Sequence, residues 1–152
     1  MFLALTVWLG GIILFIVLAP TAFSVLPTHA MAALIVGPML KKLHWMGIGS
    51  GIVFLLCSMA LAKLMKVRTP LLSPQHILIY LMLALTCISQ FAVMPRMAKL
   101  RQSVGDIDLL SLSDPIRLHF NALHVWSVRL EGTVLLFGLV VLYLAARVSK
   151  PQ

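Results

Sequence analysis

Charged residues are scarce in this chain. Only 11% of its 152 residues are Asp, Glu, Lys or Arg, and residues 1–40 contain none of these four. A soluble domain of this length needs far more polar surface, so the scarcity excludes an ordinary soluble protein. Hydrophobic residues fill 61% of the positions, which predicts an integral membrane protein.

Cysteine and the familiar catalytic motifs are also rare or missing. The two cysteines, Cys57 and Cys87, lie far apart within apolar stretches. Neither a disulfide nor a thiolate metal site is therefore expected. The sequence has no phosphate-binding loop, no His-Glu-x-x-His pair and no haem-attachment Cys-x-x-Cys-His. These absences favour a protein that is not an enzyme and predict no bound cofactor.

Acidic residues number only four, and the formal net charge is +8. This excess of base suits contact with the anionic headgroups of a lipid bilayer. A nucleic-acid-binding protein would need a basic face on a soluble scaffold, which is missing here, so no nucleic acid is expected as a partner.

Four apolar stretches are long enough to cross a bilayer as helices, which takes about 20 residues. They cover about residues 2–26, 44–64, 76–98 and 119–146. Spanning segments are helical because the bilayer offers no partners to free backbone groups. A further apolar segment at about 28–42, which contains Gly37-Pro38, predicts an interfacial helix. The sequence thus predicts an all-α, integral membrane four-helix bundle that forms a single domain over 1–152.

A short motif occurs twice. Lys42-Leu43-His44-Trp45 recurs as Arg117-Leu118-His119-Phe120, and at the same offset Pro20 corresponds to Pro95. A competing register aligns Leu43-His44 with Leu123-His124 instead. Either register predicts two helical hairpins related by a parallel pseudo-repeat about an axis along the membrane normal.

The last span carries polar residues that need an explanation. His124, Ser127 and Glu131 fall at i, i+3 and i+7, so they line one face of a helix. Ionisable groups in a membrane helix usually face a protein or water-filled interior. Because His44 begins the second span near the same membrane surface, we expect one polar cluster of His44, His124, Ser127 and Glu131, with His44 facing His124.

Imidazoles allow several interpretations of this cluster. They bind metal ions and haem, and they carry protons near neutral pH. If a metal ion binds, His44 and His124 are its ligands, and haem between two helix-borne histidines is a further alternative. The simplest alternative is that residues at helix ends anchor the protein among the headgroups, as we expect for Trp45, His119 and Trp126.

Glycines and one proline are candidates for close helix packing. Gly47 and Gly51 form a G-x-x-x-G pattern, which lets two membrane helices approach closely. Gly10, Gly11 and Pro20 in the first span and Gln90 in the third are expected to serve the same bundle interior.

The basic residues barely distinguish the two sides of the membrane. The side with both termini has Lys63, Lys66, Arg68, Arg147 and Lys150, and the other side has Lys41, Lys42, Arg96, Lys99, Arg101 and Arg117. By the positive-inside rule these counts alone do not decide the orientation. The first side is purely basic and has a compact loop, which favours both termini in the cytoplasm.

Several short motifs, in this order, resemble a known family. They are Trp8-Leu9-Gly10-Gly11, Ala19-Pro20-x-x-Phe23, Leu43-His44-Trp45 and Leu123-His124-x-x-Ser127. The chain resembles small bacterial membrane proteins of unknown function that are related to eukaryotic transmembrane protein 205. The resemblance implies four transmembrane helices, a place in the bacterial inner membrane and no established activity. The association of the eukaryotic relative with resistance to platinum drugs implies metal or drug export as one direction. Glu131 stands in the neighbourhood where the family often has an asparagine.

These observations lead to three interpretations of function. The first is an accessory or structural subunit of a membrane complex, with other membrane proteins as partners. The second is a small transporter or metal-handling protein that uses the polar cluster near one membrane surface. The third is a haem-binding redox subunit.

Overall fold

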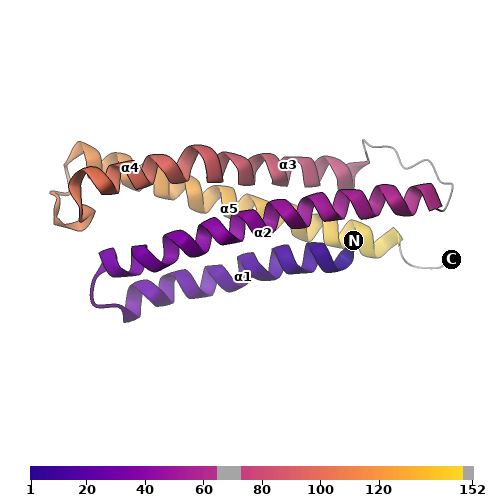
Figure 1. Ribbon diagram of the computed structural model, residues 1–152, viewed down its shortest axis with the longest axis horizontal. Helices are drawn as coiled ribbons and strands as arrows, with labels where there is room; N and C mark the ends of the chain where they lie inside the picture. Colours follow the sequence, from indigo (N-terminus) through magenta and orange to yellow (C-terminus); the bar gives the residue numbers. More distant parts are fainter. Residues whose placement is uncertain (65–72, 149–152) are drawn as a thin grey trace.

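The computed structural model describes residues 1–64 and 73–148 as a bundle of long helices (Figure 1). The elements are α1 (Phe2–Val25), α2 (His29–Leu64), α3 (Pro74–Ile88), the π-helical turn η1 (Ser89–Val93), α4 (Met94–Val104), the 3-10 turn η2 (Ile107–Leu109) and α5 (Pro115–Val148). All regular structure within the described ranges is helical, which confirms the predicted all-α four-helix membrane bundle. Lys66, Arg68 and Lys150 lie outside the described residues.

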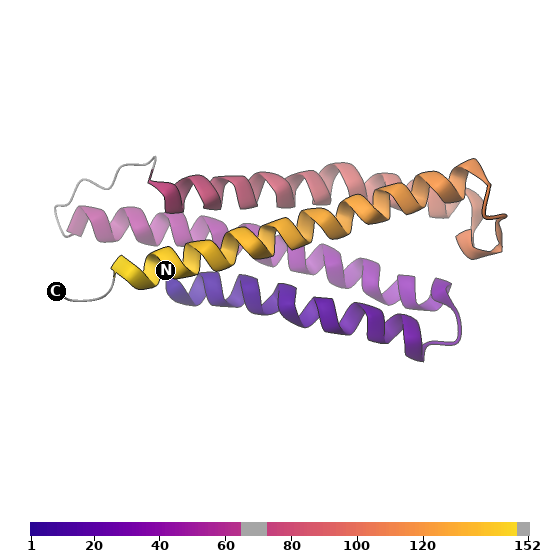
Figure 2. The same ribbon diagram turned by 180° about the vertical axis from the view of Figure 1, so that it is seen from behind.

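The described part of the chain crosses the length of the bundle four times, because α3, η1 and α4 together form one continuous rod. In the ring of neighbours, α1 packs against α2 and α5, and α3 packs against the same two helices. The turn between α1 and α2 lies at the same end as η2, which we call the hairpin end (Figures 1 and 2). The start of α1 and the end of α5 point to the opposite end, the terminal end. The two hairpins, α1–α2 and α3/α4–α5, therefore run in the same direction, and the internal repeat itself stays a prediction.

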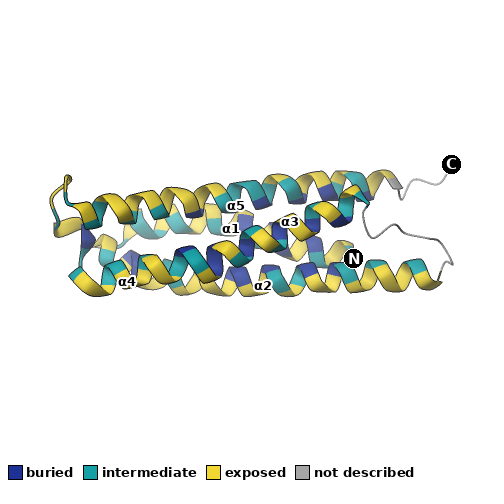
Figure 3. Ribbon diagram, turned by 90° about the horizontal axis from the view of Figure 1, so that it is seen from above, coloured by how far each residue is buried: buried dark blue, intermediate teal, exposed yellow. Residues whose placement is uncertain are grey.

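The outer faces of the bundle are apolar. Each of the four rods is long and apolar enough to cross a membrane. Large hydrophobic side chains are exposed along every rod, for example Val17, Leu56, Phe91 and Leu136. Figure 3 shows exposed residues, in yellow, along all the long helices. A bundle with apolar side chains both inside and outside is suited to lipid as its solvent, so the chain is an integral membrane protein.

Three of the four rods, those of α2, α3/α4 and α5, extend further than the sequence predicts. Residues 29–42, expected as a separate interfacial helix, are the first part of α2, and the helix continues through Pro38. Pro20 likewise lies inside α1. A proline removes one backbone hydrogen bond, but membrane helices tolerate this because neighbouring groups compensate. Helix α5 begins at Pro115, where Asp114 accepts a hydrogen bond from the backbone N–H of Ile116 through its side chain at 2.7 Å.

The interior of the bundle is built around Trp8 of α1. Its indole lies directly over Gly47 and Gly51 of α2, and a Cβ on either glycine would overlap it. On the other side of α1, Leu9 packs onto Gly138 of α5 in the same way. Close packing on glycine thus joins α1 to both of its neighbours.

The other predicted packing residues of the first span are placed differently. A Cβ on Gly11 would overlap Met46 and Leu43 of α2, so this glycine also lies at the α1–α2 contact. A Cβ on Gly10 would meet open space within the described part of the chain, and Pro20 is exposed.

Candidate functional site

A buried polar triad joins three of the four rods. The imidazole of His44 lies between Gln90 and Glu131, with Nδ1 at 2.9 Å from Oε1 of Gln90 and Nε2 at 2.6 Å from Oε1 of Glu131. His44 is 1% exposed and Gln90 7% exposed, and the side chain of Glu131 is 13% exposed. We call these three residues, from α2, η1 and α5, the His44 triad.

Helical spacing directs His44 and Glu131 into the interior. His44, Gly47 and Gly51 occupy one face of α2, at i, i+3 and i+7, and all three are buried. Glu131 lies between the buried Ser127 and Val134 on the inner face of α5. His44 and Glu131 therefore point inward because the small or apolar residues on the same face of their own helices are buried in the bundle.

Gln90 reaches the triad from a widened helical turn. The backbone N–H of Met94 bonds to the carbonyl of Ser89, five residues earlier, instead of the usual fourth. Pro95 follows directly and has no N–H to offer the preceding turn. Single π turns of this kind occur frequently at functional sites, and here the turn contains a triad residue.

The hydrogen bonds determine how protons are arranged in the triad. The Oε1 atom of Gln90 can only accept, so Nδ1–H of His44 donates to it. Nε2 then has two arrangements with Glu131: a neutral imidazole accepts from a protonated carboxyl group, or an imidazolium donates to a carboxylate. Both arrangements have zero net charge, which is what a membrane interior requires of ionisable groups.

Two serines lie near the triad in the sequence. Ser127, one turn before Glu131 on α5, is 5% exposed. Ser89, next to Gln90, is fully buried, and within the described ranges its Oγ is the one buried side-chain nitrogen or oxygen without a hydrogen-bond partner.

The remaining predicted residues lie on the outside. His124 is exposed and lies about 10 Å along α5 from Glu131. His119 is exposed near the hairpin end, and the indoles of Trp45 and Trp126 are more than half exposed. The structure thus brings His44, Ser127 and Glu131 into the interior, while the polar partners of His44 are Gln90 and Glu131.

A second buried histidine is missing from the residues that the sequence predicts. His76 is 3% exposed near the terminal end, where Nε2 lies 3.0 Å from Oγ of Ser58 and Nδ1 contacts Oγ of Ser73. The sequence does contain a signal for this histidine. His76 lies in the first turn of α3, just after Ser73-Pro74, and a polar side chain so close to an apolar stretch needs hydrogen-bond partners.

Polar contacts at the hairpin end are also absent from the sequence predictions. Nδ1 of His29 lies 3.0 Å from Oδ2 of Asp108, and both side chains are largely exposed. Arg117 donates to the backbone carbonyls of Asp108 and Leu110 at 3.2 and 2.6 Å. These contacts hold η2 between the start of α2 and the start of α5.

Positive charges mark two levels along the bundle. At about 1.5 Å per residue, Lys42 and Lys63 are about 31 Å apart along α2, and Arg129 and Arg147 about 27 Å apart along α5. Between them Glu131 is the one Asp, Glu, Lys or Arg residue on these two helices. The low-charge layer between these two levels is about as thick as the hydrocarbon core of a bilayer, which is about 30 Å. The His44 triad then lies about 3 Å inside its edge toward the hairpin end, as measured from Lys42 and Arg129.

The triad has no free ligand position at His44. Both ring nitrogens already have protein partners, so a metal ion at His44 would have to displace Gln90 or Glu131. Within the described ranges, no three His, Cys, Asp or Glu side chains gather closely enough to hold a metal ion.

Comparison with known protein families identifies one that covers most of the chain. The family described as "Domain of unknown function (DUF4149)" matches residues 3–105, which cover α1 through α4 and include His44 and Gln90 but not Glu131. No curated protein and no solved structure matches the chain.

Proposed function

Because the chain belongs to this family of uncharacterised proteins, we propose a function from the geometry: an accessory or structural subunit of a membrane complex. One observation carries the proposal. The tip of the α1–α2 hairpin exposes large apolar side chains well beyond the positively charged level of Lys42 and Arg129.

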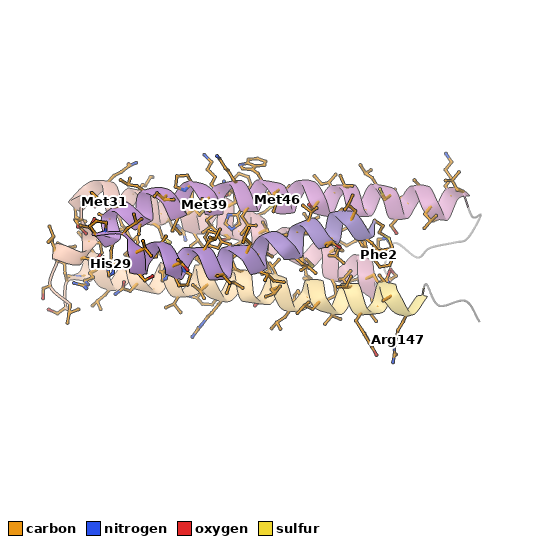
Figure 4. All side chains as sticks on the ribbon, turned by 90° about the horizontal axis from the view of Figure 1, so that it is seen from below. Phe2, His29, Met31, Met39, Met46 and Arg147 are labelled. Atoms are coloured by element: carbon orange, nitrogen blue, oxygen red, sulfur yellow. The ribbon has the colours of Figure 1, made fainter. Side chains whose placement is uncertain are left out.

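The hairpin tip is defined here by its exposed apolar side chains, Val17, Val25, Met31, Leu34 and Ile35. Along α2, His29 lies about 20 Å beyond Lys42, on the side away from the low-charge layer. The headgroup region of a bilayer is only about 5–8 Å thick on each side. Figure 4 shows Met31 and His29 at this end, and Phe2 and Arg147 at the other.

Lipid headgroups do not cover a tip of this length. Leu34 is 71% exposed and Val25 74% exposed, although both lie outside the low-charge layer. Apolar patches in such positions mark protein interaction sites. A second membrane protein that packs on the tip would remove these side chains from the headgroup region and from water, and this is the role we propose for the partner.

Purification from native membranes tests the proposal. We expect the protein, extracted in a mild detergent at its natural abundance, to migrate with a partner protein. Leu34→Gln should release that partner, because it places an amide in the centre of the apolar tip. Leu112→Gln is the matched control, since Leu112 is equally exposed at the same end but belongs to the loop before α5. A wild-type protein that migrates alone, or an equal loss of the partner in both variants, would contradict the subunit role.

We also propose the bacterial inner membrane as the location, with the terminal end in the cytoplasm, where Lys63 and Arg147 contribute to a purely basic surface. The resemblance to small bacterial membrane proteins supports the location. A fluorescent reporter fused after residue 152, active only in the cytoplasm, should fluoresce.

A small transporter or metal-handling protein is the second candidate, and the buried pair of His44 and Glu131 favours it. Ionisable residues inside a membrane bundle often mark ion or proton paths. This function predicts that the purified wild type contains more bound metal than the His44→Ala/His124→Ala variant. Equal metal content would count against it, and a Soret band in the cofactor-replete wild type would instead indicate haem.

A further inference from the structure

A long groove follows the outer seam between α1 and α2. It has two sections that meet at Met46, which lines both. The section toward the hairpin end has a volume of about 240 Å³ and lies between Met39–Met46 of α2 and Gly11–Leu18 of α1. The section toward the terminal end has a volume of about 450 Å³ and lies between Met46–Cys57 of α2 and Met1–Val7 of α1. Met39 and Met46 follow each other along the seam in Figure 4.

The lining of this seam groove is apolar except for two side chains. Lys42 lines the first section, is exposed, and has a second exposed lysine, Lys41, beside it. Ser50 is the one polar side chain among the residues that line the second section. Small residues make the second section wide, and a Cβ on Gly49 would meet open space rather than described atoms.

The groove is aligned with the levels of the bilayer. Lys42 lies at the edge of the low-charge layer, where phosphate groups of lipids are found. From there the groove runs about 22 Å along α2 to Cys57, into the hydrocarbon core. A cation at the headgroup level and an apolar channel below it correspond to the two parts of a phospholipid.

We propose that the seam groove binds one anionic phospholipid, with its phosphate at Lys42 and one acyl chain along Met46–Cys57. The second section, with a volume of about 450 Å³ and an almost wholly apolar lining, provides the surface along which the acyl chain would lie. The site is independent of the subunit role, because the acyl-chain section lies inside the low-charge layer and the hairpin tip outside it.

Native mass spectrometry of the full chain tests the proposal. The protein is released from vesicles that contain equal parts of phosphatidylglycerol, which is anionic, and phosphatidylcholine, which has no net charge. We expect the wild type to retain one phosphatidylglycerol molecule in preference to phosphatidylcholine. Lys42→Gln should reduce that preference about fivefold, which corresponds to about 1 kcal/mol for one lysine near an anionic surface. The matched control, Lys63→Gln, changes an exposed lysine at the far end of the same helix and should leave the preference unchanged.

Two glycine variants separate the acyl-chain site from the headgroup contact. Gly49→Leu, whose Cβ meets open space, adds a large side chain to the groove and should abolish retention of either lipid. Gly10→Leu, whose Cβ also meets open space, adds the same side chain at a residue that does not line the groove. Circular dichroism and gel filtration verify that each variant is folded. Retention of the two lipids in equal amounts by the wild type would overturn the proposal. So would a dimer of the wild type that Gly49→Leu converts to a monomer, because the groove would then belong to a second copy of the chain.

Discussion

Replacing Glu131 separates two contributions that the His44 triad can make to stability, the carboxylate of Glu131 itself and the hydrogen bond that it shares with His44. Glu131→Gln keeps a hydrogen-bond partner for His44, because the amide N–H₂ can donate to Nε2 of a neutral imidazole while Nδ1–H still donates to Gln90. Glu131→Ala removes the partner altogether. The two variants therefore share the loss of the carboxylate and differ in the hydrogen bond.

The expected magnitudes follow from burial. His44 is 1% exposed, so in Glu131→Ala its Nε2 is left without a partner and without water, which costs about 1–3 kcal/mol. The truncated side chain also leaves space between α2 and α5, which adds to the cost. We expect a loss of about 2–4 kcal/mol for Glu131→Ala and less than about 1 kcal/mol for Glu131→Gln.

The free energy of unfolding in mixed micelles, titrated with a denaturing detergent, measures both losses. Thr133→Val is the control on the same helix, since the hydroxyl of Thr133 bonds only to its own helix, at the carbonyl of Arg129. A double-mutant cycle between Glu131→Ala and His44→Ala should give a coupling energy of at least about 1 kcal/mol. This exceeds the average of about 0.6 kcal/mol for hydrogen bonds between membrane helices, because the 2.6 Å contact is short and buried. A coupling energy near zero, or equal losses for the alanine and glutamine variants, would refute the reasoning.

Two further predictions concern helix packing and the hairpin end. Gly47→Leu should lower the free energy of unfolding by about 1–3 kcal/mol because its side chain overlaps the indole of Trp8, whereas Gly49→Leu, which meets open space, should be nearly neutral in the same titration. Arg117→Ala should lower the melting temperature more than Asp108→Asn, because Arg117 satisfies two backbone carbonyls while the exposed ion pairs of Asp108 contribute less than about 1 kcal/mol. Equal effects within either pair of variants would contradict that prediction.

The four-helix membrane bundle could be predicted because apolar length alone decides whether a segment spans a bilayer. The start of α2 could not, since a proline such as Pro38 normally ends a helix that is surrounded by water. In the structure α2 nevertheless runs from His29 through Pro38 without a break.

The triad could be predicted in part. The spacing of Ser127 and Glu131 on α5 identifies Glu131 as a residue that needs a partner in the bundle interior. The apolar stretch after His44 locates this histidine near one membrane surface. The partnership depends on how far α2 and α5 slide past each other, which no single helix determines. His124 illustrates this point: it shares a face of α5 with Glu131 by spacing alone, yet it is exposed two turns closer to the hairpin end.

The sequence predicts an interior position for Gln90, but it does not predict the partnership of Gln90 with His44. In a regular α-helix each side chain is rotated by about 100° from the one before it. The π turn over residues 89–93 changes this rotation, so the side chains of and after the turn point in other directions than a regular helix predicts. Pro95 is visible in the sequence, but a proline in a membrane helix is compatible with a kink, a π turn or a nearly straight helix. The choice among them depends on the neighbours, here α2 and α5.

The bundle uses two different means to hold its helices together. Lipid is as apolar as the helix interior, so burial of apolar side chains does little to determine which helices become neighbours. The polar His44 triad joins α2, η1 and α5, whereas α1 contributes no side chain to it and is held by Trp8 on Gly47 and by Leu9 on Gly138. Loss of the triad should therefore loosen α3/α4 from α2 and α5 while α1 stays packed. Loss of the glycine contacts should release α1 alone and leave the triad formed.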